Sequence, residues 1–453
     1  MQNQPLTAEG LRPALGLGSA VLLVIGGMIG VGVFVNPAVV ARSLPSGPVV
    51  MAAWALGGVM ALLGALVYAE LAARLPATGG EYVYLRETYG PLAGFLFGWT
   101  TLLVVQAGGM AAVCIVFARN VSIAVGIPFD DHLLVCGVLL ALAAVNCLGV
   151  RAGAGAQGAL GILKVVAIFA LVGTGLFLLP AAPAAAPAPP VLNPLKAFGA
   201  AMIPVVFSYG GWQTANYVAG EMRRPGRDLS RALILGVAGV IAIYLLVTFA
   251  CLRVLGPRAL GATLTPTSDV LRMAAGPAGA RLAAGAIALS ALAYLSQSML
   301  TAPRVYFAMA RDGLFFSSVG RVLEGARAPA MAIAVQAAWT AVLALSGSYE
   351  RILSYVTAMN FLFFGLSASS LFILRRREGA LKAAAHVGFR TPLHPTTTVV
   401  FIVSCAAVVA SAFWAFPADS LMGYAILLLG VPPYLWWRRR KRLDATPELT
   451  SSR

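Results

Sequence analysis

The sequence predicts an all-α membrane protein, built as a bundle of transmembrane helices. Of its 453 residues, 60% are hydrophobic and 11% are charged, whereas about a quarter of the residues of a soluble domain are charged. Apolar runs recur along the chain at the length of about 20 residues that a helix needs to cross a bilayer. The runs lack the alternation of polar and apolar residues that transmembrane strands show.

Twelve apolar runs are candidate spans, and they predict one transmembrane domain over residues 1–453 without a folded domain outside the membrane. The segment PAAPAAAPAPP, at 180–190, has the composition of an extended linker between the fifth and sixth runs. The runs lie at approximately 15–40, 48–73, 92–118, 133–150, 158–180, 197–219, 229–252, 277–310, 329–346, 350–375, 397–415 and 418–437.

The distribution of Lys and Arg predicts the orientation, because loops rich in these residues stay in the cytoplasm. If the N-terminus is cytoplasmic, EMRRPGRDLSR (221–231), the arginines at 375–377 and RRRKR (438–442) all fall on the cytoplasmic side. We therefore expect both termini on the cytoplasmic face of the cytoplasmic membrane. The formal net charge of +16 then suits anionic lipid headgroups, and we expect membrane lipids rather than nucleic acid as partners.

Residues that serve catalysis or metal binding are few and scattered. The five cysteines lie in or beside apolar runs, where small buried side chains are expected. The three histidines lie near span ends and loops, without metal-ligand spacing and without a matching set of Ser or Cys and Asp. The sequence therefore predicts no enzyme, no metal site and no cofactor.

The first span is interrupted by glycines. The stretch VIGGMIGVGVFVNP contains Gly26, Gly27, Gly30 and Gly32, and each glycine weakens a helix interior by about 1 kcal/mol relative to alanine. One interpretation is close helix packing, because Gly26 and Gly30 form a GxxxG pair. The other is a helix that unwinds at mid-depth.

A second interruption favours unwinding. Gly210 and Gly211 break the sixth run near its middle, in FSYGGWQTANYVAGEMRRP. Two broken spans at corresponding positions of two five-span halves are typical of secondary transporters with inverted repeats. An unwound helix frees N–H groups on one half and C=O groups on the other, and these groups can bind the carboxylate and the ammonium of a zwitterion.

Four segments carry a resemblance to a known family. They are GGMIGVGVFVNP (26–37), GALVYAELAARLPATGGEYVYLRETYGPLAGFLFGW (64–99), FSYGGWQTANYVAGEMRRPGRDLSRA (207–232) and TAPRVYFAMARDG (301–313). The first resembles the first-span signature GxIIGSGIFxxP of the amino acid, polyamine and organocation superfamily of transporters. The other three are similar to its L-type amino-acid transporter branch.

The resemblance implies the leucine-transporter fold, with 12 transmembrane helices. Five plus five helices would form inverted repeats at about 15–180 and 197–375, and two helices at about 397–437 would be appended. It also implies that amino acids are the substrates.

The resemblance further implies a substrate site at the two interruptions. N–H groups of the first would bind the substrate carboxylate, and the carbonyls of Phe207 and Gly210 would accept from its ammonium. The Phe207 ring would act as a gate, although a packing role is the alternative. Val31 stands where the family often has Ser, which leaves backbone donors only. The expected substrate-binding residues are Met28, Ile29, Gly30, Val31, Gly32, Gly108, Phe207, Ser208, Gly210 and Gln213.

Lys164 is a cation within the fifth run, where charged residues are rare and mark function. Its long stem could also carry the ammonium back to the membrane surface. The resemblance favours function, because several sodium-independent members have a fifth-span Lys where sodium-driven relatives bind Na⁺. In this role Lys164 would contact the carbonyl of Gly26 or Ile29 and, on the eighth span, Tyr294 or Ser298.

Five carboxylates fall at expected cytoplasmic span ends, where they are either gates or partners of nearby arginines, and we expect ion pairs. No carboxylate lies at mid-span beside the expected site, so a carboxylate proton relay is not predicted. The five are Glu70, Glu81, Glu87, Glu221 and Asp228.

These observations favour a sodium-independent exchanger of neutral L-amino acids. A proton-coupled or cationic amino-acid carrier of the same fold is the second hypothesis, and a transporter-like sensor is the third. The loop at 119–132 lacks the cysteine through which animal L-type relatives bind a glycoprotein subunit. We therefore expect no covalent heavy subunit, while the sequence leaves the oligomeric state open.

Overall fold

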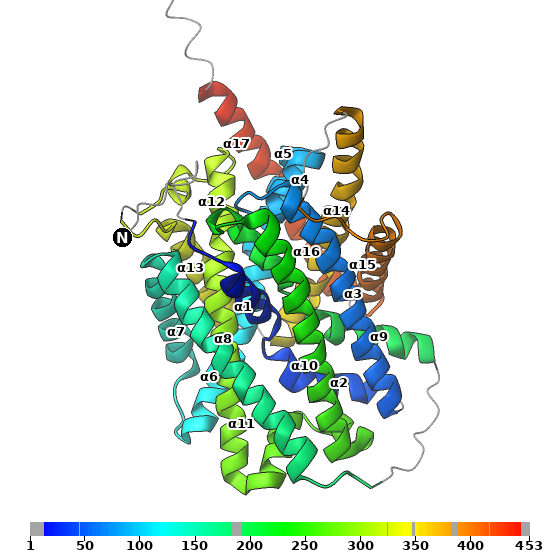
Figure 1. Cartoon of the computed structure of the whole chain (residues 1–453). Coiled ribbons are helices and arrows are strands. Elements are labelled where there is room, and N and C mark those ends of the chain that lie inside the picture. The colour runs from blue at the N-terminus through cyan, green and yellow to red at the C-terminus, as the bar shows by residue number, and fades with distance from the viewer. Residues whose placement is uncertain are drawn as a thin grey trace, which may run out of the picture.

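The computed structural model is a bundle of helices, and the residues that it describes contain no β-sheet (Figure 1). The first part of the chain forms α1 (Leu17–Met28), α2 (Gly32–Ser43), α3 (Gly47–Arg74), α4 (Glu81–Tyr89), α5 (Pro91–Thr100), the π-helical turn η1 (Thr101–Val105), α6 (Gln106–Val125), α7 (Asp131–Cys147), α8 (Val150–Gly173) and the π-helical turn η2 (Thr174–Leu178). The described residues are 13–44, 46–183, 193–323, 325–346, 349–381, 388–415 and 417–444.

The second part of the chain continues the bundle. It forms α9 (Pro194–Ser208), the 3₁₀ helix η3 (Trp212–Glu221), α10 (Pro225–Ala262), α11 (Pro266–Thr301), α12 (Pro303–Arg311), the 3₁₀ turn η4 (Ser317–Gly320), α13 (Ala330–Ser346), α14 (Tyr349–Leu381), α15 (Thr396–Ala415), α16 (Pro417–Leu428) and α17 (Val431–Asp444).

The all-α membrane class is confirmed. Among the described residues, eight helical segments are long and apolar enough to cross a bilayer, or nine if α1 and α2, bent by 41°, count as one span. The helices α7 and α13 are apolar but shorter, with 17 residues each. The count of twelve spans stays a prediction.

One expected span begins earlier than the sequence indicates. The apolar run starts at 277, whereas α11 begins at Pro266. The helix is kinked between these points, because Gly276 has φ of +58° and Pro277 follows it. A positive φ is open to glycine at little cost, so the additional turns bend away from the axis of the span.

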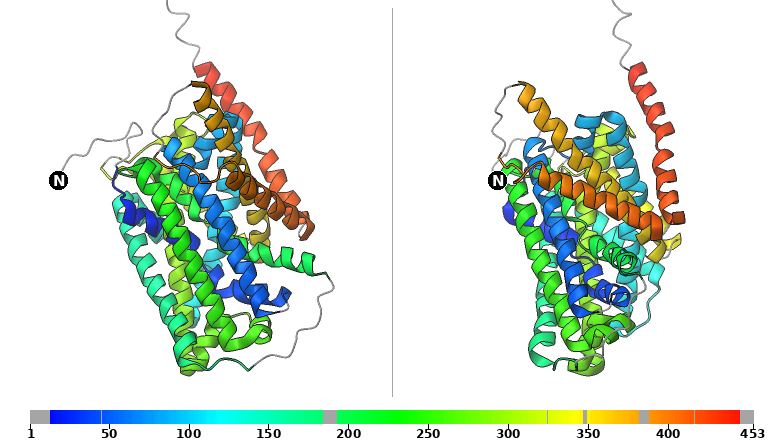
Figure 2. Two further views of the ribbon diagram at one scale, coloured as in Figure 1. Left: turned by 45° about the vertical axis from the view of Figure 1, so that its right-hand side comes forward. Right: turned by 90° about the vertical axis from the view of Figure 1, so that its right-hand side faces the viewer.

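Two interrupted helices lie side by side in opposite directions. The helix α1 gives way to α2 after Met28, and α9 gives way to η3 after Ser208. Packing joins α2 to α9 and α1 to η3, and both views of Figure 2 show α2 next to α9. The two interruptions therefore meet inside the bundle.

The helices α4, α5, α12 and α17 gather at the upper end of the bundle in Figure 1, where α5 packs against the other three. A fully buried ion pair joins α12 to η3 at this end. Arg304 donates to both carboxylate oxygens of Glu221, at 2.7 and 3.3 Å, and neither side chain is exposed. The backbone carbonyl of Glu221 also accepts the N–H groups of Ala14 and Leu15.

This pair predicts a large effect of a single substitution. Arg304→Met should lower the free energy of unfolding by about 3–5 kcal/mol, because it leaves the Glu221 carboxylate buried without a counter-ion. Thermal unfolding of the purified chain in detergent measures this. Arg311→Met, an exposed position at the end of the same helix, is the matched control. A loss no larger than that of the control would contradict the assignment.

Candidate functional site

The two interruptions cross with their backbones in contact. A Cβ atom at Gly27 would lie 2.6 Å from the Gly211 carbonyl oxygen, and one at Gly211 would lie 2.1 Å from the Gly27 carbonyl oxygen. Gly211 also has φ of +101°, a conformation that other residues rarely adopt. Glycine is therefore required at both positions for the helices to approach this closely.

Side chains from three other helices satisfy the carbonyls of the first interruption. Lys164 on α8 donates its ammonium to the carbonyls of Gly26, at 3.1 Å, and Ile29. Ser290 on α11 donates to the Gly30 carbonyl at 2.9 Å. A cation is favourable here because the carboxyl end of α1 carries partial negative charge.

Tyr244 on α10 bridges the two interruptions. Its hydroxyl lies 2.7 Å from the Met28 carbonyl oxygen and 3.0 Å from the Ser208 carbonyl oxygen. Asn36 adds a second link, because its amide donates to Ser208 Oγ at 2.7 Å and to the Pro204 carbonyl at 3.1 Å. The broken segments are thus held by specific donors.

A cavity of about 60 Å³ lies between the interruptions. The first N–H groups of α2 face no acceptor within that helix, and Gly32, where α2 begins, borders the cavity. The described residues of the lining include uncharged polar side chains but no charged one. Of the expected residues, it includes Met28, Gly30, Val31, Gly32, Phe207, Ser208, Gly210, Gln213, Tyr294 and Ser298.

Two expected substrate-binding residues, Ile29 and Gly108, do not border the cavity. Gly26 was expected only as a contact of Lys164 and is one. The carbonyls of Gly26 and Ile29 accept from Lys164, and neither residue borders the cavity. Gly109 rather than Gly108 lines it, because consecutive helical residues point about 100° apart at 3.6 residues per turn.

The expected links from the eighth span also differ. Ser290 contacts the first interruption, while Tyr294 and Ser298, one and two turns further along α11, line the cavity. The Phe207 carbonyl already accepts the Gly210 N–H at 3.0 Å, so a substrate ammonium would use its second lone pair.

Sequence reasoning missed several cavity residues. Gln106 and Gln297 lie within long helical segments, Thr214 lies near the start of η3, and Asn360 and Phe361 come from α14. A polar amide inside an apolar run, as at Gln106 and Gln297, is the signal that could have found two of them.

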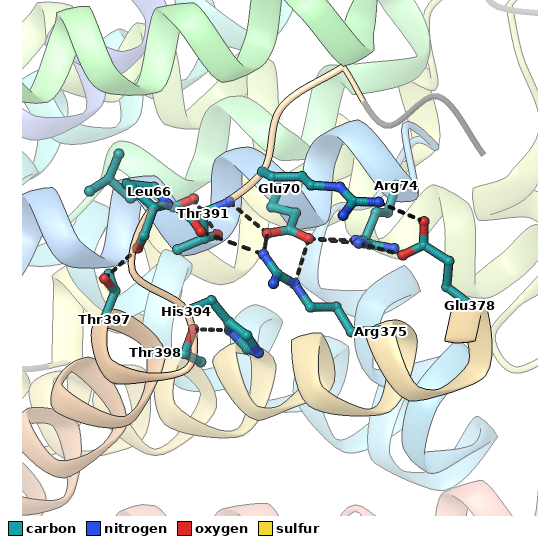
Figure 3. Close-up of polar contacts among 11 residues, drawn as sticks. Leu66, Glu70, Arg74, Arg375, Glu378, Thr391, His394, Thr397 and Thr398 are labelled. Atoms are coloured by element: carbon teal, nitrogen blue, oxygen red, sulfur yellow. Dashed lines mark hydrogen bonds and ion pairs between the residues drawn. The ribbon is translucent and has the colours of Figure 1, made fainter. Parts of the chain in front are cut away.

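Most of the five acidic residues are paired with arginine. Figure 3 shows Glu70 between Arg74 and Arg375, at 2.7 and 2.6 Å, with the Thr391 N–H donating to it at 2.7 Å. Glu87 pairs with Arg86 at 2.8 Å, and Glu221 pairs with Arg304 as described above. Asp228 has no ion pair within the described part of the chain.

Glu81 departs from the expectation of an arginine partner. Its carboxylate accepts from the hydroxyls of Tyr68 on α3, at 2.8 Å, and Tyr217 on η3, at 3.0 Å. Burial raises the pKa of Glu81 from 4.5 to about 7, although both hydroxyls favour the charged form. The residue lies on α4, outside the candidate spans, and joins three elements.

Glu81 predicts a pH dependence of stability. A raised pKa means that the folded chain binds the proton more tightly than the unfolded chain, so this stabilisation is present below pH 4.5 and is lost as the pH rises through about 7. Glu81→Gln should flatten the fall of the unfolding temperature over this range, whereas Glu87→Gln, half-exposed on the same helix, should keep it. If the unfolding temperature depends on pH in the same way for the unchanged chain, Glu81→Gln and Glu87→Gln, then Glu81 does not cause the pH dependence.

Comparisons with known proteins identify the family of the chain. Residues 15–432 match the family model of the amino acid permeases. The chain belongs to this family. Its relatives place it in the L-type branch of the amino acid, polyamine and organocation superfamily, so this permease has the leucine-transporter fold and is a multi-pass membrane transporter, not an enzyme.

Three relatives match the permease over most of their length. The serine/threonine exchanger SteT of Bacillus subtilis (strain 168) is 31% identical, over 96% of this chain and 98% of that protein. The large neutral amino acids transporter small subunit 2 of Mus musculus is 26% identical, over 95% and 83%. The b(0,+)-type amino acid transporter 1 of Homo sapiens is 28% identical, over 89% and 84%.

Proposed function

We propose that this permease exchanges neutral L-amino acids across the cytoplasmic membrane by alternating access and without sodium. The observation that carries the proposal is the buried ammonium of Lys164 on the carbonyls of Gly26 and Ile29. Carbonyl oxygens are the ligands that a hard cation would use. The Lys164 ammonium occupies these oxygens, and its positive charge would repel a sodium ion that came close enough to bind them.

The lining of the cavity suits a substrate that is a zwitterion with an uncharged side chain. N–H groups at the start of α2 would bind the carboxylate, and the carbonyls of Phe207 and Gly210 would accept from the ammonium. Among the described residues, no charged side chain borders the cavity, so the ammonium of a lysine-like substrate would lose its hydration without gaining a counter-ion. The names of the relatives, a serine/threonine exchanger and a large neutral amino acids transporter, favour neutral substrates and exchange.

The proposal includes the topology and the partners. We place both termini in the cytoplasm, because clusters of Arg lie at the end that carries α4, α12 and α17. Residues 1–453 would form one domain, with repeats at about 15–180 and 197–375. No covalent heavy subunit is expected, because the loop at 119–132 has no cysteine and Cys114, before it, is buried in α6.

Counterflow in liposomes tests the proposal. The purified chain should accumulate radiolabelled neutral amino acid when unlabelled substrate is inside, equally with sodium or with choline outside and without a proton gradient. Neutral amino acids of medium or large size should compete best. Competition by arginine or lysine alone would favour the cationic carrier, and absence of counterflow would favour a sensor. Activity that appears only with a co-purifying protein would refute independence from a heavy subunit.

Lys164 provides a second prediction. Lys164→Met keeps an unbranched side chain, one atom shorter, but removes the donor to two carbonyls. We expect turnover to fall about tenfold or more, because one hydrogen bond to a charged group is worth about 1.5–3 kcal/mol. Lys196→Met, an exposed position at the start of α9, is the control. Unchanged turnover in Lys164→Met, with folding checked by thermal unfolding, would count against the proposal.

Gly30 tests the site itself. A Cβ atom there would lie 3.5 Å from the Tyr294 ring, an ordinary contact, so Gly30→Ala should fold and retain binding. Gly30→Val adds methyl groups beside the freed N–H groups, and it should abolish substrate competition while the unfolding temperature stays near that of Gly30→Ala. Normal affinity in Gly30→Val would exclude this location.

A further inference from the structure

A second cavity, of about 320 Å³, lies at the end of the bundle that carries α17. Its lining residues come from parts of the chain other than the two interruptions. One wall is the segment between α12 and η4, and the other is α17. Its main lining residues are Phe315, Phe316, Ser317, Ser318, Trp437 and Arg440. The site combines a guanidinium, two hydroxyls and aromatic rings.

The polar groups of this cavity suit an anion with several oxygens. Arg440 is exposed and has no ion pair with a described residue, and its guanidinium lies 5.7 Å from the centre of the Trp436 ring. Ser317 is exposed and Ser318 is partly exposed, and both line the cavity with Arg440. A guanidinium presents paired N–H donors that match the oxygens of a phosphate.

A neighbouring cavity on α17 shows why this one is selective. That cavity, of about 330 Å³, contains Arg438 but also Asp312, which pairs with Arg86. An anion there would meet the carboxylate of Asp312, whereas none of the described residues that line the cavity at Arg440 carries a carboxylate. An anion therefore meets less repulsion at Arg440 than beside Asp312.

The surroundings indicate a lipid rather than a free ion. Phe316 is 56% exposed and Trp436 is 52% exposed, and tryptophan is enriched where a helix leaves the hydrocarbon. The candidate span Ser420–Arg440 ends at this level, and Arg438 and Arg439 add exposed positive charge. A headgroup bound at Arg440 would have its acyl chains beside exposed rings.

We propose that the cavity between α17 and the segment 313–318 binds the phosphate of an anionic phospholipid through Arg440, Ser317 and Ser318. The binding is independent of the proposed substrate.

The position of the cavity couples it to the packing of this end of the bundle. The Phe315 ring lies 5.4 Å from that of Trp437, which also packs on Phe95 of α5 at 5.9 Å. The preceding Asp312 accepts from the Tyr82 hydroxyl of α4 at 2.6 Å. A bound headgroup therefore stabilises the segment that ties α12 to α4 and α17.

The test uses the full purified chain in phosphatidylcholine nanodiscs with or without phosphatidylglycerol. We expect phosphatidylglycerol to raise the unfolding temperature and labelled phosphatidylglycerol to bind saturably, while inorganic phosphate at the same ionic strength has no effect. Arg440→Gln should weaken lipid binding about tenfold or more, the effect of losing one charged hydrogen bond. Arg439→Gln, on the same helix but outside the cavity, should bind as the unchanged chain does.

Several outcomes would overturn the site. Equal weakening in Arg439→Gln and Arg440→Gln would mean attraction to surface charge alone, and stabilisation by inorganic phosphate would mean a free-anion site. If the variant with both Ser317→Ala and Ser318→Ala still binds the lipid saturably and with unchanged affinity, the two hydroxyls are not part of the site. Each leaves amino-acid counterflow untouched, so failure of the lipid site is distinguishable from failure of the proposed function.

Discussion

The backbone contact between Gly27 and Gly211 sets the arrangement of the helices around it. Breaking two helices inside a bilayer exposes polar backbone groups that lipid cannot satisfy. The contact therefore requires donors from elsewhere, and Lys164, Tyr244 and Ser290 supply them from α8, α10 and α11. Three helices are thus positioned by the need to satisfy the carbonyls of one interruption.

The distribution of charge separates the interior of the bundle from its end. The cavity at the interruptions has uncharged walls, with Lys164 behind them on the carbonyls of the first interruption. The ion pair of Glu70 lies near the end of α3, and that of Glu221 joins the end of η3 to the start of α12. Buried charges are costly unless they are paired, and these carboxylates are paired at the end of the bundle. The cavity can therefore bind the carboxylate and the ammonium of a substrate through backbone groups, without charged side chains among the described residues of its lining.

Much of the fold was predictable because it follows from local composition. Glycine placed the first interruption at Met28–Gly32, and α1 and α2 end and begin at those residues. The second was expected at Gly210 and Gly211, and both residues lie between the end of α9 at Ser208 and the start of η3 at Trp212, with the positive φ at Gly211. The contact of α11 was misplaced from Ser290 to Tyr294 and Ser298, since the rotation of a helix about its axis is set by the packing of all its neighbours.

The membrane class, the positions of the glycine breaks and the isolated cation at Lys164 were readable from the chain alone, because apolar length, helix-breaking residues and buried charge are properties of short segments. The partners were decided only by the tertiary structure. Glu70 and Glu81 are separated by a short connection, yet the first pairs with arginines and the second with tyrosines from α3 and η3. Those partners are brought to each carboxylate by helices that cross from distant parts of the chain, and local sequence does not encode how far each helix is turned or displaced when they pack.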